Sequence, residues 1–302
     1  MILGTAQLGM AYGIANKLGR PGEPEVREIV RTAWERGIRH FDTAQAYGDS
    51  ETTLGLAFRQ LGLSSQALVI SKMGSAWTTR NPEETCRNIV QSLERLGVTR
   101  LWGILAHDEA VLDQPISPGL LEARRLGLVE HLGVSVYSVD RALQALATDG
   151  LEIIQVPANI FDRRMHRAGV FRKAEACGKI MLVRSVFLQG LLLMNPAEAP
   201  VEIPRARNAL QLLEEFCATE QVFRTSFALG YVREMAPRAE LIIGAESAKQ
   251  VRDNCQAEHL ANMTMLATRW DRIWPEDVSP LLDPRAWRLV PVRQGRETGC
   301  RR

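Results

Sequence analysis

Short apolar segments alternate with longer amphipathic segments along most of the chain, and this alternation constrains the fold more than any other feature. Eight short segments have the aliphatic and β-branched composition of buried strands, and segments with helical spacing separate them. The expected strands are residues 2–8, 38–42, 67–72, 101–107, 129–136, 152–156, 180–185 and 240–243. Apolar strands joined by crossovers are typical of parallel sheets that are buried on both faces. The pattern therefore predicts an α/β protein with a parallel sheet.

Signals at the ends of the amphipathic segments support their assignment as helices. Asn81 precedes Pro82 and two glutamates, which is typical of a capped helix start, and Gly97 follows the last apolar position of the same segment. An earlier segment begins near Pro24 and ends at Gly37. These boundaries leave room for a helical crossover between consecutive strands.

Eight strand–helix units favour a closed (β/α)8 TIM barrel, and an open doubly wound sheet is the rival architecture. The chain has 302 residues, which suits a single barrel of about 250 residues with an extension. We see no change of composition that would mark a linker. We expect one barrel domain over residues 1–258. We expect residues 259–302 to form a C-terminal extension that packs on the barrel or folds over its mouth.

Composition argues against several classes of function. The formal net charge of +2 gives no reason to expect a nucleic-acid or membrane partner, so a small molecule is the expected partner. The five cysteines form no CxxC pair, and no signal peptide is evident, so a reducing cytoplasmic location is expected. Only five histidines are available for a metal-dependent hydrolase, and no metal site is expected. They are His40, His107, His131, His166 and His259.

Four polar residues lie at or just beyond the ends of three successive expected strands. Asp42 ends the second strand and is followed by a small-residue loop that carries Tyr47, while Lys72 and His107 end the next two. Catalytic groups of a (β/α)8 barrel sit at the C-terminal ends of its strands. A tyrosine needs a neighbour that lowers its pKa from about 10 before it serves readily as an acid, and a lysine paired with an acid can do this.

These residues lie in motifs that resemble the aldo-keto reductase family. The similarity runs from Gly4 to about Asn254, and it includes the stretch from Phe41 to Gly48. It implies that Tyr47 donates a proton to a substrate carbonyl, that Lys72 paired with Asp42 lowers the tyrosine pKa, and that His107 orients the carbonyl oxygen. The implied activity is NAD(P)H-dependent reduction of an aldehyde or ketone, or oxidation of the corresponding alcohol or aldose.

The resemblance also implies a nicotinamide cofactor, although the chain lacks the GxGxxG motif of the Rossmann fold. Ser135 and Gln155 would hold the carboxamide, and Val136 stands where the family often has an asparagine. The loop entering the helix after the last strand would bind adenosine phosphate groups, since a helix N-terminus favours anions. The implied cofactor-binding residues are Gly4, Thr5, Ala6, Asp42, Ser135, Gln155, Ser185, Phe187, Gln189, Gly190, Gly244, Glu246, Ser247, Gln250 and Asn254.

Glu246 departs from the family pattern at the adenosine end. Relatives that bind the 2′-phosphate of NADP often have a basic or neutral residue there, and a carboxylate would repel that phosphate. Lys249 or Arg252 could compensate for this charge. NADP(H) is the family default and the more expected cofactor, with NAD(H) possible because of Glu246.

The substrate is less closely defined by the sequence. The expected substrate contacts are Tyr47, His107 and Trp77, with Met10, Tyr12 and Phe161 as further candidates for the pocket lining. The similarity leans toward bacterial members that act on sugars or small aldehydes. The alternative is a non-catalytic or slow nicotinamide-binding sensor or regulatory subunit on the same barrel, like the potassium-channel β subunits.

Overall fold

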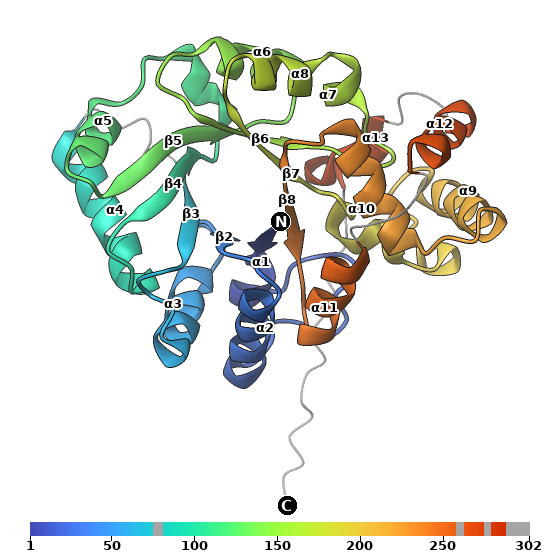
Figure 1. The fold of residues 1–302 in the computed structure, drawn as a ribbon, viewed down its shortest axis with the longest axis horizontal. Helices are drawn as coiled ribbons and strands as arrows, with labels where there is room; N and C mark the ends of the chain where they lie inside the picture. The colour runs from blue at the N-terminus through green and yellow to red at the C-terminus, as the bar shows by residue number, and fades with distance from the viewer. Residues whose placement is uncertain (75–80, 258–262, 275–278, 288–302) are drawn as a thin grey trace, which may run out of the picture.

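A computed structural model of the chain describes residues 1–74, 81–257, 263–274 and 279–287. Its eight parallel strands pair in chain order and close into a barrel, because β1 pairs with both β2 and β8 (Figure 1). Closure confirms the (β/α)8 barrel and rules out the open sheet. The strands are β1 (Ile2–Gly4), β2 (His40–Asp42), β3 (Leu68–Met73), β4 (Leu101–Ala106), β5 (Val129–Ser135), β6 (Ile153–Pro157), β7 (Ile180–Arg184) and β8 (Glu240–Gly244).

Helices surround the strands on the outside of the barrel (Figure 1). Asn81 caps α4 by accepting a hydrogen bond from the Glu83 N–H at 3.0 Å, and Gly97 ends that helix in the left-handed conformation, both as expected. The helices are α1 (Ala6–Gly9), α2 (Glu23–Glu35), α3 (Ser50–Leu61), α4 (Pro82–Leu96), α5 (Pro118–Arg125), α6 (Val139–Ala147), α7 (Arg164–Arg167), α8 (Val170–Ala176), α9 (Ala206–Thr219), α10 (Arg224–Met235), α11 (Ala248–Ala257), α12 (Met263–Ile273) and α13 (Ser279–Leu282). Short 3-10 turns are η2 (Glu109–Asp113), η3 (Leu188–Leu193), η4 (Pro196–Glu198) and η5 (Pro284–Ala286).

The first strand is shorter than predicted. The expected strand reaches Leu8, but β1 ends at Gly4 and residues 6–9 form the single helical turn α1. The turn lets Gly9 lie directly against the loop after β2, where an added Cβ would come 2.0 Å from the Tyr47 carbonyl oxygen. The contact between these two loops therefore overrides the local strand pattern.

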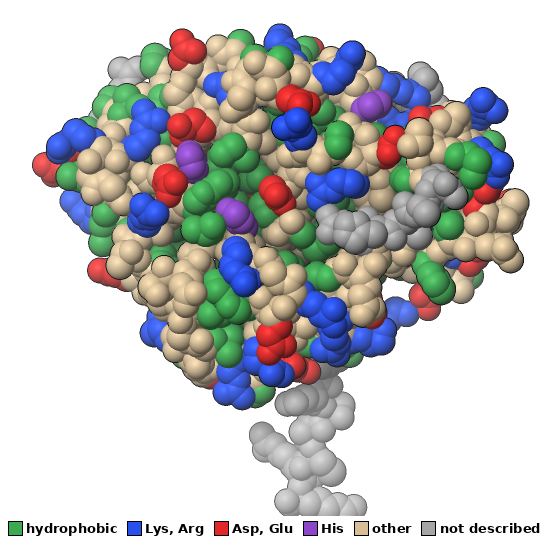
Figure 2. Space-filling model, viewed as in Figure 1, with side chains coloured by type: hydrophobic (Ala, Val, Ile, Leu, Met, Phe, Trp, Pro, Cys, Tyr) green, Lys and Arg blue, Asp and Glu red, His purple; other side chains and the backbone are tan. Residues whose placement is uncertain are grey.

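Six aliphatic side chains form a buried cluster inside the barrel. This cluster consists of Ile2, Ile70, Leu105, Ile153, Leu182 and Ile242. Trp102 packs beside it and lies edge-on to His40 and His131, with ring centroids 4.6 and 5.0 Å apart. Figure 2 shows histidine and apolar side chains together near the centre of the face in view. The barrel interior is thus filled by side chains around this cluster, and the cavity described below lies at the C-terminal ends of the strands.

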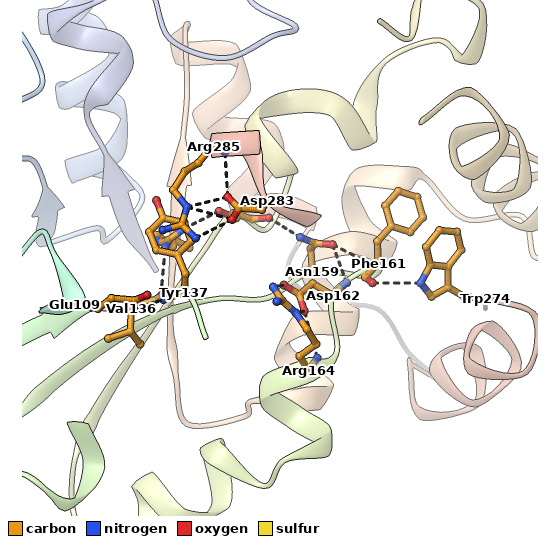
Figure 3. Close-up of polar contacts among 12 residues, drawn as sticks. Glu109, Val136, Tyr137, Asn159, Phe161, Asp162, Arg164, Trp274, Asp283 and Arg285 are labelled. Carbon is orange, nitrogen blue, oxygen red and sulfur yellow. Dashed lines mark hydrogen bonds and ion pairs between the residues drawn. The ribbon is translucent and has the colours of Figure 1, made fainter. Parts of the chain in front are cut away.

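The C-terminal part of the chain is anchored to the barrel by tryptophans. The Trp270 indole N–H donates to the Ile160 carbonyl oxygen at 2.8 Å, and the Trp274 indole N–H donates to the Phe161 carbonyl oxygen at 3.2 Å (Figure 3). Farther along the chain, η5 brings the Arg285 guanidinium to 3.4 Å from the centroid of the Tyr137 ring, just beyond the end of β5. The expected boundary between barrel and extension, at residues 258–259, lies outside the described residues.

Candidate active site

Lys72 and Asp42 form a buried ion pair inside the C-terminal end of the barrel. The Lys72 ammonium donates to both Asp42 carboxylate oxygens, at 2.6 and 2.7 Å, and to the Thr43 carbonyl oxygen at 3.0 Å. The two residues are 1% and 5% exposed. They come from β3 and β2, which are hydrogen-bonded neighbours, so the parallel register brings the two strand ends together. Burial lowers the pKa of Lys72, and the Asp42 carboxylate opposes that effect.

Tyr47 and His107 lie next to this pair and face the same cavity. Their ring centroids are 5.8 Å apart, and the Lys72 ammonium is 5.1 Å from the centroid of the Tyr47 ring. The structure thus brings together all four residues that the sequence placed at successive strand ends. Within the described parts of the chain, the Tyr47 hydroxyl and the His107 imidazole make no hydrogen bond, which leaves both groups available to a ligand.

The environment fixes the protonation state of both groups. Burial, and then the Asp42 carboxylate, raise the pKa of the Tyr47 phenol, while the Arg184 guanidinium lowers it. We expected Lys72 to lower this pKa, but the net effect of the surroundings is to raise it. Burial and the nearby Lys72 and Arg184 charges lower the pKa of His107 to about 4. At neutral pH the site therefore holds a protonated phenol and a neutral imidazole.

A hydrogen-bond chain connects Asp42 to the residues expected to hold a carboxamide. The Gln155 amide donates to Asp42 Oδ2 at 2.9 Å, and the Ser135 hydroxyl donates to Gln155 Oε1 at 3.0 Å. Ser135 and Gln155 are 3% and 1% exposed, and they come from β5 and β6. Arg184, at the end of β7, continues the chain by donating to the Ser135 hydroxyl at 3.4 Å.

These groups share a cavity of about 320 Å³ with most of the expected cofactor residues. Of the expected residues, Lys72 and Ser247 are not part of the lining, and Trp77 lies outside the described residues. Phe161, a candidate for the pocket lining, is buried instead against Trp274, with ring centroids 4.3 Å apart. The expected residues that line the cavity are Gly4, Thr5, Ala6, Tyr12, Asp42, Tyr47, His107, Ser135, Gln155, Ser185, Phe187, Gln189, Gly190, Gly244, Glu246, Gln250 and Asn254.

The cavity also includes residues to which the sequence analysis gave no role. Tyr137 and Arg184 line the end of the cavity near Tyr47 and His107, and Asp253 lines the end near α11. Tyr137 and Arg184 follow the same strand-end rule that located Lys72, at the ends of β5 and β7, so this rule could have found them. Asp253 lies inside a helix, where the sequence offers no comparable signal.

The side chains of Glu246 and Asp253 line the end of the cavity near α11, whereas Lys249 and Arg252 are not part of the lining. The Glu246 backbone N–H donates to the Gln250 side-chain oxygen at 2.7 Å, and burial raises the pKa of the Glu246 carboxyl. Lys249 forms an ion pair with Asp253 at 2.6 Å. Arg252 is close enough to Glu28 to lower the pKa of that carboxyl. Both basic residues expected to compensate for Glu246 thus have acidic neighbours of their own.

Among the described residues, no group of three or more His, Cys, Asp or Glu side chains is arranged to hold a metal ion. None of the described helices is long and apolar enough to cross a bilayer.

The chain is similar to one family of known proteins. The model of the aldo/keto reductase family matches residues 1–275. The NADH-specific methylglyoxal reductase of Escherichia coli (strain K12) is 25% identical over 267 residues, covering 76% of this chain and 81% of that protein. The D-threo-aldose 1-dehydrogenase of a Pseudomonas species is 24% identical over 298 residues, covering 84% and 90%.

Solved structures share the same fold. Aldo-keto reductase AKR11C1 from Bacillus halodurans, in its holo form, superposes with a TM-score of 0.75 at 20% identity over 92% of this chain and 93% of that one. Glycerol dehydrogenase AKR11B4 from Gluconobacter oxydans has a TM-score of 0.71 at 22% identity, with 90% of each chain covered. At these identities the likeness concerns the barrel architecture alone.

Proposed function

This chain belongs to the aldo/keto reductase family, and from that premise we propose that it is a cytoplasmic NAD(P)H-dependent oxidoreductase with Tyr47 as its proton donor. It reduces an aldehyde or ketone, or oxidises the corresponding alcohol or aldose. The observation that carries the proposal is the phenol and the neutral imidazole facing one cavity above the Lys72–Asp42 pair. Small carbonyl compounds and sugars are the proposed substrates.

The residues support the proposed chemistry as follows. A bound nicotinamide supplies the hydride. The neutral His107 imidazole donates a hydrogen bond to the carbonyl oxygen, and the Tyr47 phenol gives that oxygen its proton. The Lys72 ammonium, 5.1 Å from the centre of the phenol ring, stabilises the phenolate that remains. In the oxidative direction the Tyr47 phenolate accepts the proton of the alcohol, and the oxidised nicotinamide, when bound, would accept the hydride.

The cofactor fits the cavity through residues at both of its ends. Ser135 and Gln155 offer a hydroxyl and an amide to the carboxamide, and their mutual hydrogen bond holds them in place. At the far end, the N-terminus of α11 opens toward the cavity at Gly244 and Glu246. Free backbone N–H groups at a helix N-terminus suit phosphate oxygens.

For the identity of the cofactor we propose NAD(H) rather than the family default, NADP(H). Glu246 and Asp253 both line the cavity near α11, and Asp253 binds the ammonium of Lys249. A 2′-phosphate there would meet two carboxylates, whereas a free ribose hydroxyl could donate to Glu246. The name of the methylglyoxal reductase relative is in keeping with this choice, since that protein is described as NADH-specific.

Titration of NADH and NADPH against protein fluorescence tests the cofactor proposal. We expect tighter binding of NADH, and we expect Glu246→Arg to shift the Kd ratio toward NADPH by about tenfold or more, because it replaces a repulsive charge with an attractive one. Glu246→Gln, which removes the charge without adding another, should give a smaller shift. An unchanged ratio in Glu246→Arg would show that this position does not select the cofactor.

A panel of small aldehydes, ketones and aldoses with both cofactors tests the reaction itself. Turnover is followed by the absorbance of the reduced nicotinamide. The proposal requires reduction of at least one carbonyl compound, or oxidation of one alcohol or aldose. Bound cofactor without any turnover would instead favour a sensor or regulatory subunit on the same barrel.

A further inference from the structure

Arg184 lies at the end of the cavity that Tyr47 and His107 also line. It ends β7, and its guanidinium donates to the Ser135 hydroxyl at 3.4 Å, to the Ser185 hydroxyl at 3.3 Å and to the Val136 carbonyl oxygen at 3.2 Å. All three acceptors are uncharged, and all three distances are long for a guanidinium. The group is therefore held in place without being neutralised.

A tyrosine ring orients this guanidinium. The Arg184 Cζ atom lies 4.0 Å from the centroid of the Tyr137 ring, within the range of a cation–π contact. The Tyr137 backbone N–H donates to the Glu109 carboxylate at 2.7 Å, which fixes the residue that bears the ring (Figure 3). The flat faces of ring and guanidinium thus limit the directions in which Arg184 can present its N–H groups.

A second guanidinium, that of Arg285, contacts the same ring but has a partner for its charge. Asp283 accepts hydrogen bonds from Arg285 at 2.7 and 2.9 Å, and Figure 3 shows Asp283 beside Arg285. Arg184 forms no ion pair with any carboxylate in the described part of the chain. The two arginines are therefore a matched pair, one neutralised and one not.

Lys72 and Asp42 compensate each other's charge at this end of the cavity, and the Glu109 carboxylate accepts the hydrogen bond of the Tyr137 N–H. His107 is neutral at physiological pH. The Arg184 charge remains, and it lowers the pKa of Tyr47, Lys72 and His107, which places it within electrostatic reach of the groups that would handle the carbonyl. A substrate with a negative group would supply the missing charge.

We propose that Arg184 is a specificity-determining residue that binds a carboxylate on the substrate, so that oxo acids are preferred over neutral carbonyl compounds. This inference rests on the proposed function, because it names the substrate class of the same site. A guanidinium suits a carboxylate especially well, since its planar N–H groups match the two oxygens of the anion. Two of its five N–H groups remain after the contacts described above.

The cofactor is the other possible source of an anion for Arg184. Its phosphates, however, are expected near the N-terminus of α11, whereas Arg184 touches Ser135 and acts on Tyr47 and His107 at the opposite end. The carboxamide is uncharged and would leave the guanidinium unneutralised. The experiment below therefore measures cofactor affinity beside substrate preference.

The test compares carboxylates with their own methyl esters. The pairs are 4-formylbenzoate with methyl 4-formylbenzoate, and succinic semialdehyde with methyl 4-oxobutanoate. We expect the wild-type protein to favour the carboxylate in kcat/KM, and Arg184→Met to reduce the carboxylate-to-ester ratio about 10- to 100-fold, the usual effect of losing a charge-assisted hydrogen bond. Arg184→Lys, which keeps the charge but not the fork, should lie between them. The control variant Arg285→Met should change the ratio less than about threefold.

Binding measurements keep this inference separate from the proposed function. Each aldehyde is titrated into the cofactor-saturated protein, and the Kd is read from quenching of tryptophan fluorescence. Tighter binding of the carboxylates that is lost in Arg184→Met supports the inference, even if no compound is turned over and the proposed function fails. Equal binding of carboxylates and esters by the wild type overturns it. So does an Arg184→Met variant that loses cofactor affinity and keeps its ratio.

Thermal melting verifies that each variant is folded. Should Arg184→Met not fold, the wild-type ratio and Arg184→Lys still decide the question, because a wild-type protein without carboxylate preference contradicts the proposal. A ratio unchanged in Arg184→Lys, with equal affinity for both partners of each pair, contradicts it as well.

Discussion

The role proposed for Tyr47 depends on its phenol hydroxyl group. Tyr47→Phe removes the acid and leaves the ring, so turnover should fall by about 10²- to 10⁴-fold, the usual contribution of a general acid. The Kd for the cofactor should change little, because Ser135, Gln155 and the α11 N-terminus remain. Steady-state kinetics and fluorescence titration together check both expectations. Turnover near the wild-type rate would remove Tyr47 from the mechanism.

Removing one member of the Lys72–Asp42 ion pair should destabilise the protein more than replacing both members. Lys72→Met leaves a buried carboxylate with the Gln155 amide as its remaining side-chain donor, so the free energy of unfolding should fall by about 3–5 kcal/mol. The double variant Lys72→Met with Asp42→Asn should recover part of that loss, because no unpaired charge remains. Urea denaturation of both variants measures the difference. A double variant less stable than Lys72→Met would contradict this view of the pair.

His107 should make the stability of the protein depend on pH. Its folded pKa of about 4 lies below the 6.5 of an ordinary histidine, so the unfolded chain binds the proton more tightly. The stabilising contribution is present above pH 6.5 and is lost as the pH falls from 6.5 toward 4. His107→Gln should lose less stability than the wild type between pH 6.5 and 4.5, as measured by urea midpoints. Parallel pH curves for the two proteins would contradict the assignment.

At the residue scale, a simple rule indicated which side chains lie at strand ends, but it could not indicate which charged groups surround each of them. A polar side chain at the end of an apolar strand located Asp42, Lys72 and His107, since barrel geometry gathers strand ends. The same rule could have found Arg184, but the absence of an acidic partner for it is visible only in three dimensions. Likewise, the balance of charge around Tyr47 depends on distances that no motif contains.

Among the elements, α12 shows how much of the C-terminal segment belongs to the core. Trp270 is fully buried, stacks with Trp274 at a centroid distance of 5.8 Å and meets Phe216 and Phe227 edge-on. Its indole N–H also reaches the loop that follows β6. We therefore infer that α12 is an integral part of the barrel's outer layer.

Trp270→Ala should lower the free energy of unfolding by about 3–5 kcal/mol, because it opens a large cavity between α12, α10 and α9. Met265→Ala, on the half-exposed side of the same helix, should change it by less than about 0.5 kcal/mol. Urea denaturation gives both values. Equal effects of the two substitutions would mean that α12 does not pack as described.

Element boundaries show where the sequence reaches its limit. The core of every strand lies within or next to its predicted range, since apolar composition marks a buried strand wherever it pairs. The end of β1 was misplaced because the turn at α1 depends on how closely Gly9 approaches the Tyr47 loop, a contact between segments about 40 residues apart. Periodicity along the chain carries no information about such a contact.

At the scale of the whole molecule, the count of eight strand–helix units was enough to predict the barrel. The sequence did not indicate the contact between Arg184 and Tyr137 or the place of Asp253 in the cavity lining, because both depend on how separate elements meet. The family resemblance supplied the remaining assignments, and the positions where this chain departs from it, Val136 and Glu246, are those where physical reasoning adds most.

The pairing of β1 with β8 has a consequence for synthesis of the protein. Gly4 pairs with Gly244, so the barrel stays open until residue 244 has left the ribosome. At a translation rate of about 5–20 residues per second, that is on the order of 10–50 s after β1 emerges. Asp42, Tyr47, Lys72 and His107 are therefore made early and wait for the last strand. During that interval the nascent chain exposes two unpaired strand edges, and we expect chaperones to bind it.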